Sequence, residues 1–266
     1  MTIRRLPVPA VYNVATQVRV TAESCGGQVA LVSVDSAGEV RRFSYSQLDE
    51  FSNRLANRFG ASRLGKGDRV AVMLSPSFEA AVAHLAALKS GLIIVPLYTG
   101  GTSSFIESRV REAGARLLLL DSRHLSVVEE IAPALHDLEV EVLPIDDGQG
   151  FNTGMLETVV EKASNRFDVV RTTPRDPAFL VFTSGSEGKA KGVLHGHGEV
   201  LSACSSFGLR SAPPRSGELA WTTADWSWLM GLNIALVAWQ AGGSVLVQEE
   251  ARFNLPGSSN SWPIMG

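Results

Sequence analysis

The sequence predicts an α/β fold with mostly parallel sheets flanked by helices. Short apolar segments alternate with helix-length amphipathic segments four times, and the links between them are short. This alternation is typical of a doubly wound, mostly parallel sheet. The 266 residues suffice for one large domain or two modest ones, and the apolar content of 45% and charged content of 19% are ordinary for a globular protein.

The first elements are a hairpin and a capped helix. Residues 29–45 form two alternating runs around the turn signal Ser36-Ala37-Gly38, which predicts a β-hairpin. Ser44 lies three residues before Gln47, the spacing of a capping box, so a helix is expected to begin there. Its apolar residues fall on one face, and Gly60 is expected to end it.

The alternation of strands and helices follows. Apolar runs predict strands at 69–74, 92–97, 116–121 and 139–146, and the segments between them predict helices at 78–89, 103–114 and 124–135. We interpret residues 1–150 as a first α/β subdomain. The pattern fades after Asp146, so residues 151–176 are expected to be a linker or a long excursion.

A second α/β subdomain is predicted to begin at residue 177 and to reach 253. Its expected elements are a strand at 178–182, an extended segment at 192–197, a helix at 199–207, a turn at 211–217, a strand at 219–223, a helix at 228–240 and a strand at 244–249. The segment 226–247 is about as long as a membrane span needs to be, roughly 20 residues. Asn233, Gln240 and the pair Gly242-Gly243 interrupt it, which favours a buried helix, a turn and a strand. Residues 254–266 have no periodicity and form an atypical tail.

Charge and cysteine content exclude several classes of protein. The formal net charge of -3 argues against binding to nucleic acid or to an anionic membrane through bulk electrostatics, and stable membrane insertion is not expected. The N-terminus has no continuous apolar run of the secretory type. Cys25 and Cys204 match no metal-binding spacing and give no disulfide framework, so a reducing, cytoplasmic location is expected.

The segment 180–193, LVFTSGSEGKAKGV, contains the groups that a phosphate chain requires. Glycines leave backbone N–H groups unobstructed, hydroxyls can donate to phosphate oxygens or bind magnesium, and lysines supply positive charge; these residues are Gly185, Gly188, Gly192, Thr183, Ser184, Ser186, Lys189 and Lys191. The spacing is not that of a Walker A loop, and the residues after Lys191 look extended rather than helical. Composition alone leaves a flexible surface turn equally open, and the carboxylate of Glu187 favours that alternative.

The residues TSGSEGKAKG resemble the phosphate-loop signature of the adenylate-forming superfamily, which contains acyl-CoA synthetases, luciferases and peptide-synthetase adenylation domains. The matching positions are Thr183, Ser184, Gly185, Ser186, Gly188, Lys191 and Gly192, whereas Glu187 and Ala190 depart from the usual residues. Residues 43–97 resemble the opening of such enzymes, and WTTADWSWLMG (221–231) is similar to a segment of acetyl- and medium-chain acyl-CoA synthetases.

This resemblance implies the N-terminal portion of the large domain of an adenylate-forming enzyme. It implies an AMP-forming acyl-CoA synthetase that uses ATP, Mg²⁺ and coenzyme A with a small-molecule carboxylate. The implied ATP phosphate-binding residues are Thr183, Ser184, Gly185, Ser186, Glu187, Gly188 and Lys191, with the hydroxyl of Thr183 or Ser186 near magnesium. His197, Asp225 and Trp226 are implied to lie near the acyl pocket. From the residues alone, one of His195 and His197 could be a surface histidine, Trp226 and Trp228 could be core aromatics, and Asp225 could be a helix N-cap.

The resemblance also predicts an incomplete domain. The Tyr-Gly-x-Thr-Glu segment and the adenylation lysine of the family are not found in the 266 residues, so no catalytic residue is assigned and a truncated N-terminal fragment is expected. The alternative function is a catalytically inactive remnant that acts as a weak nucleotide-binding or interaction module. A dinucleotide-binding dehydrogenase is disfavoured, because no Gly-x-Gly-x-x-Gly follows the first buried strand.

Overall fold

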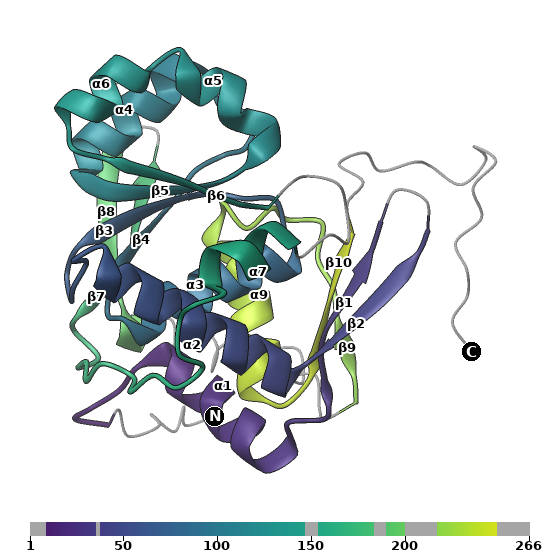
Figure 1. Ribbon diagram of the computed structural model, residues 1–266. Coiled ribbons are helices and arrows are strands. Elements are labelled where there is room, and N and C mark those ends of the chain that lie inside the picture. The colour runs from purple at the N-terminus through teal and green to yellow at the C-terminus, as the bar shows by residue number, and fades with distance from the viewer. Residues whose placement is uncertain (1–8, 36–37, 147–153, 184–189, 200–216, 249–266) are drawn as a thin grey trace, which may run out of the picture.

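Two β-sheets and the helices around them make up the computed structural model, which describes residues 9–35, 38–146, 154–183, 190–199 and 217–248 (Figure 1). The larger sheet has six strands in the order β6-β5-β3-β4-β7-β8. Its strands are β3 (Arg69–Met73), β4 (Ile93–Pro96), β5 (Ala115–Asp121), β6 (Glu141–Asp146), β7 (Pro177–Thr183) and β8 (Lys191–Gly196). All neighbours in it are parallel except β8, which runs antiparallel to β7. The predicted α/β class with mostly parallel sheets is therefore confirmed.

The smaller sheet joins the two ends of the described chain. Its order is β2-β1-β10-β9, with β1 and β10 parallel. These strands are β1 (Val29–Val34), β2 (Val40–Ser44), β9 (Leu219–Ala220) and β10 (Ser244–Gln248). Strands from before and after residues 151–176 thus share both sheets, and the division into two consecutive subdomains stays a prediction.

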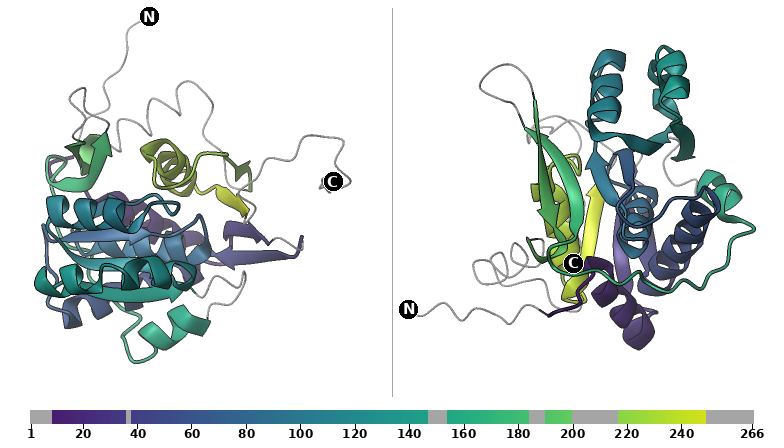
Figure 2. Two further views of the ribbon diagram at one scale, coloured as in Figure 1. Left: turned by 90° about the horizontal axis from the view of Figure 1, so that it is seen from above. Right: turned by 90° about the vertical axis from the view of Figure 1, so that its left-hand side faces the viewer.

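Helices cover both faces of the larger sheet, as Figures 1 and 2 show. The described helices are α1 (Val14–Cys25), α2 (Tyr45–Ala61), α3 (Phe78–Lys89), α4 (Ser103–Ala113), η1 (Ser122–His124), α5 (Leu125–Glu129), α6 (Ala132–Asp137), α7 (Gly154–Val160) and α9 (Leu229–Gln240). Alternate residues of β3 enter different cores: Val70 and Val72 face the core that contains α1, α2, α3 and α9, whereas Ala71 and Met73 face the core under α4 to α6. Burial on both faces explains why the strands of this sheet are almost wholly apolar.

Local sequence signals place several helix ends correctly. The capping box of α2 forms as predicted, because the Ser44 side chain accepts a hydrogen bond from the N–H of Gln47 and the Gln47 side chain accepts one from the N–H of Ser44. Helix α3 spans the predicted residues, with Ser77 as its N-cap. The helix predicted at 124–135 is instead divided into α5 and α6, because Pro133 lies in the first turn of α6 and proline suits a helix start better than an interior.

Two segments are more ordered than their sequences predicted. Helix α1 was not predicted, and its buried residues pack against α2, α3 and α9. The expected linker contains α7, and its following residues accept hydrogen bonds from side chains of α2: Asn53 donates to the carbonyl of Asn165 and Arg54 to that of Ala163. This segment is therefore held against α2 by hydrogen bonds and is not an unattached linker.

The interrupted apolar segment 226–247 forms a helix, a turn and a strand, as predicted. Helix α9 ends at Gln240, Gly242 adopts a φ of +78°, and β10 follows. No helix in the described part of the chain combines the length and the apolar character that crossing a membrane requires.

Candidate functional site: the β7–β8 hairpin and the start of α9

The two described ends of the predicted phosphate loop face each other on one hairpin. Strands β7 and β8 are antiparallel, and Thr183 pairs with Lys191. The Thr183 hydroxyl donates to the Lys191 carbonyl at 3.4 Å, and both residues are exposed. The segment after Lys191 is extended, as predicted. Ser184, Gly185, Ser186, Glu187, Gly188 and Lys189 lie outside the described residues.

Gly192 has a packing role in the hairpin. We expected it to leave a backbone N–H free for phosphate, but it lies within β8, opposite Phe182. A Cβ atom at this position would lie 2.9 Å from Leu180 Cδ1 and 3.4 Å from Phe182 Cε1. The missing side chain therefore gives space to the apolar residues at the end of β7.

His197 is fully buried directly after the end of β8, where it contacts α1. Its Nδ1 accepts a hydrogen bond of 3.2 Å from the N–H of Val14, the first residue of that helix. Burial lowers the pKa of His197 to about 4, and the charge of Asp176 offsets part of this effect. The imidazole is thus neutral at pH 7 with its proton on Nε2. The described residues provide no partner for Nε2.

Of the two alternating histidines, His195 is therefore the one at the surface, and His197 is buried. His195 Nδ1 lies 2.8 Å from Glu199 Oε2 on the protein surface. The role of His197 in an acyl pocket stays a prediction. In the described part of the chain, the His197 ring makes a single hydrogen bond, and this bond is to the backbone of α1.

Asp225 and Trp226 precede α9 in a tight turn. Asp225 Oδ1 accepts a hydrogen bond of 2.7 Å from the N–H of Ser227, and the Asp225 carbonyl accepts one of 3.1 Å from the N–H of Trp228. The N-cap of α9 is Trp228, which makes no side-chain capping bond, so the alternative that Asp225 caps this helix is wrong. The Asp225 carboxylate stabilises the turn before the helix.

Trp226 is 2% exposed and belongs to the core between the sheets. Its ring meets His84 and Trp239 edge to face, with centroids 6.0 Å apart in both cases. The Trp239 indole N–H donates to the carbonyl of Ala30 at 2.9 Å, which ties this aromatic group to β1. The core-aromatic alternative therefore describes the position of Trp226, and any contact with a substrate stays a prediction.

His84 is a site-adjacent residue that the sequence analysis missed. It lies on α3 with 1% of its surface exposed, and its Nδ1–H donates to the carbonyl of Ala80 at 2.6 Å. Burial lowers its pKa to about 4, and both the Ala80 carbonyl and the charge of Asp225 offset part of this. The signal was a lone histidine among the apolar residues of the 78–89 helix.

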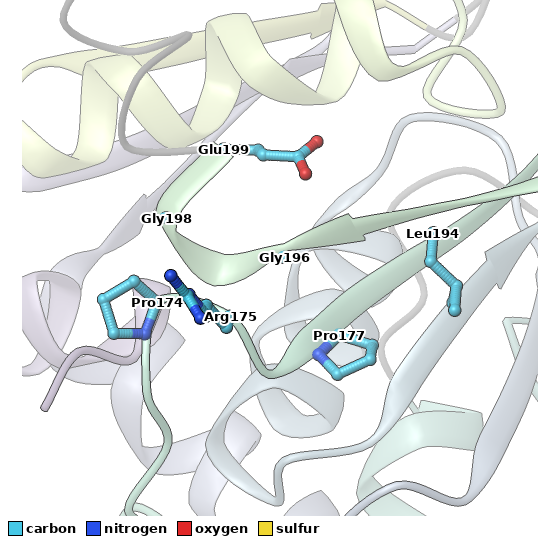
Figure 3. Close-up of a pocket in the computed structure, with 7 residues that line it drawn as sticks. All are labelled: Pro174, Arg175, Pro177, Leu194, Gly196, Gly198 and Glu199. Atoms are coloured by element: carbon cyan, nitrogen blue, oxygen red, sulfur yellow. The ribbon is translucent and has the colours of Figure 1, made fainter.

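A surface pocket of about 460 Å³ lies at the other end of the hairpin (Figure 3). It is lined by Pro174, Arg175, Pro177, Leu194, Gly196, Gly198 and Glu199. Of the lining residues, Pro177 lies six residues before Thr183, whereas Leu194 lies three residues after Lys191, about 10 Å along β8 at 3.3 Å per residue. The lining residues of the described chain include none of the predicted ATP-binding residues.

The described part of the loop ends in two exposed residues that face each other, Thr183 and Lys191. Lys191 supplies a cation, and the Thr183 hydroxyl, whose proton is directed at the Lys191 carbonyl, leaves oxygen lone pairs available. In the described ranges, no cluster of three or more His, Cys, Asp or Glu residues could hold a metal ion. Magnesium at Thr183 or Ser186 stays a prediction.

Comparison with known proteins matches residues 18–259 to the family model of the AMP-binding enzymes. The acetyl-coenzyme A synthetase of Xanthobacter autotrophicus is 27% identical over 91% of this chain and 40% of its own length. That of Cronobacter sakazakii is 29% identical over 88% of this chain and 38% of its own length. The chain thus spans about 40% of the length of these curated relatives.

Solved structures share the fold. Apo MatB from Rhodopseudomonas palustris superimposes with a TM-score of 0.75 at 24% identity, over 91% of this chain and 46% of MatB. The anthranilate CoA ligase AuaEII in complex with anthranoyl-AMP gives a TM-score of 0.79 at 19% identity, over 90% of this chain and 44% of that protein. ATP-bound MatB gives the same score as the apo form.

Proposed function

Because the chain belongs to the AMP-binding enzyme family, we propose that it supplies the phosphate-binding part of an AMP-forming acyl-CoA synthetase. In this reaction a carboxylate attacks the α-phosphorus of ATP, which forms an acyl-adenylate and releases pyrophosphate. The thiol of coenzyme A then attacks the acyl carbonyl, which forms the thioester and releases AMP. The observation that carries the proposal is the hairpin on which Thr183 and Lys191 face each other at the two ends of the matching loop.

The phosphate loop has the chemistry that the first step requires. The carboxylate approaches an already anionic phosphate, so charge neutralisation and alignment dominate this step. We assign the β- and γ-phosphates to the hydroxyls, backbone N–H groups and lysine of the loop: Thr183, Ser184, Gly185, Ser186, Glu187, Gly188 and Lys191. Magnesium would bind beside the hydroxyl of Thr183 or Ser186, where it would compensate the carboxylate of Glu187.

We assign the acyl side of the site to the turn before α9 and to His197. Trp226 lies beneath this turn and packs edge to face against the rings of His84 and Trp239, and the Asp225 carboxylate stabilises the turn. Support comes from Trp228 and Met230, which are 65% and 54% exposed although they are large and apolar. An apolar surface beside the turn suits the hydrocarbon part of a carboxylate. Coenzyme A as acceptor and a cytoplasmic location belong to the same proposal.

Binding of MgATP by the 266-residue chain tests the phosphate loop directly. Isothermal titration should give measurable binding to the wild type and a loss of at least tenfold in the double variant Ser186→Ala, Lys191→Ala, since each removed group is a charge-assisted or hydroxyl contact worth about 1 kcal/mol or more. Lys162→Ala removes one exposed positive charge elsewhere and should bind as the wild type does. Equal affinity of the wild type and the double variant would contradict the assignment.

A pyrophosphate-exchange assay distinguishes an active acyl-CoA synthetase from a catalytically inactive module. The alternative is that the chain, which spans about 40% of the length of these relatives, acts as an inactive, weak nucleotide-binding module. Exchange between ATP and labelled pyrophosphate, measured with a panel of carboxylates, should be absent for these 266 residues. It should appear with a preferred carboxylate when the chain is extended by whatever coding sequence follows it. Exchange that is absent from both proteins would favour the alternative.

A further inference from the structure

Arg109 lies in an unusual position for an arginine on a helix surface. It belongs to α4, yet its side chain is only 15% exposed. Its guanidinium carbon lies 5.3 Å from the centroid of the Phe105 ring and 4.8 Å from that of the Phe182 ring. The two rings come from different elements, so the guanidinium joins α4 to the end of β7.

The polar contacts of Arg109 do not explain this burial. Its Nη1 forms an ion pair of 2.9 Å with Glu112, whose side chain is 45% exposed. Its Nε–H is buried and has no hydrogen-bond partner within the described ranges. An arginine that served only the ion pair could extend into water, as Arg111 does in its 2.8 Å pair with Glu107 at 53% exposure. The contact with the two rings therefore determines where the Arg109 side chain lies.

Phe182 is the residue through which this contact reaches the predicted site. It immediately precedes Thr183, and across the hairpin it faces Gly192, whose missing side chain leaves space for its ring. The ring also packs against the core under α4, together with Leu180. The orientation of the last residues of β7 thus depends on what α4 presents to Phe182.

We propose that Arg109 is a positioning residue for the phosphate loop: held between Phe105 and Phe182, it orients the end of β7 from which the loop starts. The inference rests on the proposed function, because the loop has to bind ATP for its position to affect activity. Arg109 touches no reacting group in this assignment and acts only through Phe182.

Hydrogen exchange without nucleotide tests the positioning step by itself. Among the amides of Phe182, Thr183 and Gly192, those that hydrogen bond across the hairpin should exchange about tenfold faster in Arg109→Met. This factor corresponds to about 1.4 kcal/mol and lies within the range of a desolvated cation–π contact. Arg111→Met is the matched control, since it removes a similar ion pair from the solvent side of the same helix. Equal exchange at these amides in the two variants would overturn the proposal.

Three further measurements distinguish the ring contact from the charge of Arg109, from global destabilisation and from a loss of nucleotide binding. Arg109→Lys retains the charge but not the flat guanidinium that lies between two rings, so it should behave as Arg109→Met does; wild-type exchange would overturn positioning by ring contact. Melting temperatures show whether a variant is globally destabilised, and exchange that rises throughout the protein would also overturn the proposal. MgATP affinity should fall about tenfold in Arg109→Met but not in Arg111→Met. A wild type that binds no MgATP would refute the proposed function, while the exchange data would still decide whether Arg109 positions the strand end.

Discussion

Lys89 ends α3 with its ammonium group inside the protein, and the pH dependence of stability tests this burial. The side chain has no exposed surface. Its Nζ donates to Asp49 Oδ1 at 2.6 Å, to Ser52 Oγ at 2.8 Å and to Asn53 Oδ1 at 2.7 Å. Burial lowers the pKa of Lys89 to about 8, and the charge of Asp49 offsets part of the shift.

The sign and size of the effect follow from proton linkage. The ordinary pKa of 10.5 applies to the unfolded chain, so between pH 8 and 10.5 the unfolded state binds more protons than the folded state. The contribution of Lys89 to the free energy of unfolding is therefore full above pH 10.5 and is lost as the pH falls to 8. One pKa unit corresponds to about 1.36 kcal/mol, so the change across this window is about 3 kcal/mol.

Urea unfolding of the wild type and of Lys89→Met between pH 7 and 10.5 measures this change. The variant leaves oxygens of Asp49, Ser52 and Asn53 without their donor, which should reduce the free energy of unfolding by about 1–3 kcal/mol at pH 7. The difference between the proteins should then widen by about 3 kcal/mol toward pH 10.5, by the linkage given above. Lys162→Met, at an exposed position, should follow the wild type. A difference that stays constant with pH would refute the buried, shifted lysine.

Acid stability and two glycines provide further predictions. Burial lowers the pKa of His84 and of His197 to about 4, so the folded state prefers the neutral form of both. Each histidine should therefore contribute about 3 kcal/mol to the free energy of unfolding above pH 6.5, and this contribution should be lost as the pH falls to 4. His197→Phe should flatten the acid limb of the stability profile, whereas His136→Gln at the surface should not; identical limbs would contradict this reasoning. Gly231→Ala should lower the melting temperature, because its Cβ would lie 2.4 Å from a backbone oxygen. Gly60→Ala in α2 should raise it, because the new Cβ meets nothing within 4 Å. Equal shifts for the two alanine variants would contradict the distinction.

Short-range patterns were sufficient to predict much of the fold. The capping box at Ser44 and the apolar runs of β3 to β6 depend on residues close in sequence, so their elements could be predicted. Helix α1 was not predicted, although Asn13 caps it and its buried residues have helical spacing; its packing against α2, α3 and α9 depends on the assembled fold. The burial of Lys89 could not be predicted either, since a lysine in the last turn of a helix ordinarily faces water and interacts favourably with the helix dipole.

The candidate site also has features that local sequence predicts and features that depend on contacts between distant parts of the chain. The residues after Lys191 carry a local pattern from which the extended segment could be predicted, whereas the phosphate-binding role of the residues from Thr183 to Lys191 stays a prediction. The partner of His197 lies 183 residues away at Val14, and His84 meets Trp226 only because α3 and the turn before α9 pack together. Such pairs depend on the assembled sheets, and no local pattern predicts them. The resemblance named His197 and Trp226, but it did not indicate what their rings contact.

The order β2-β1-β10-β9 has a consequence for synthesis of the protein on the ribosome. The Ser244 hydroxyl donates to the carbonyl of Val29, 215 residues earlier in the chain. At the roughly 5–20 residues per second of translation, the hairpin of β1 and β2 waits about 10–40 s before β10 is made. During that interval one edge of β1 has backbone groups that can pair with any other extended chain. The smaller sheet therefore closes only after its last strand has been synthesised, and a nascent chain of this protein needs protection of that edge until then.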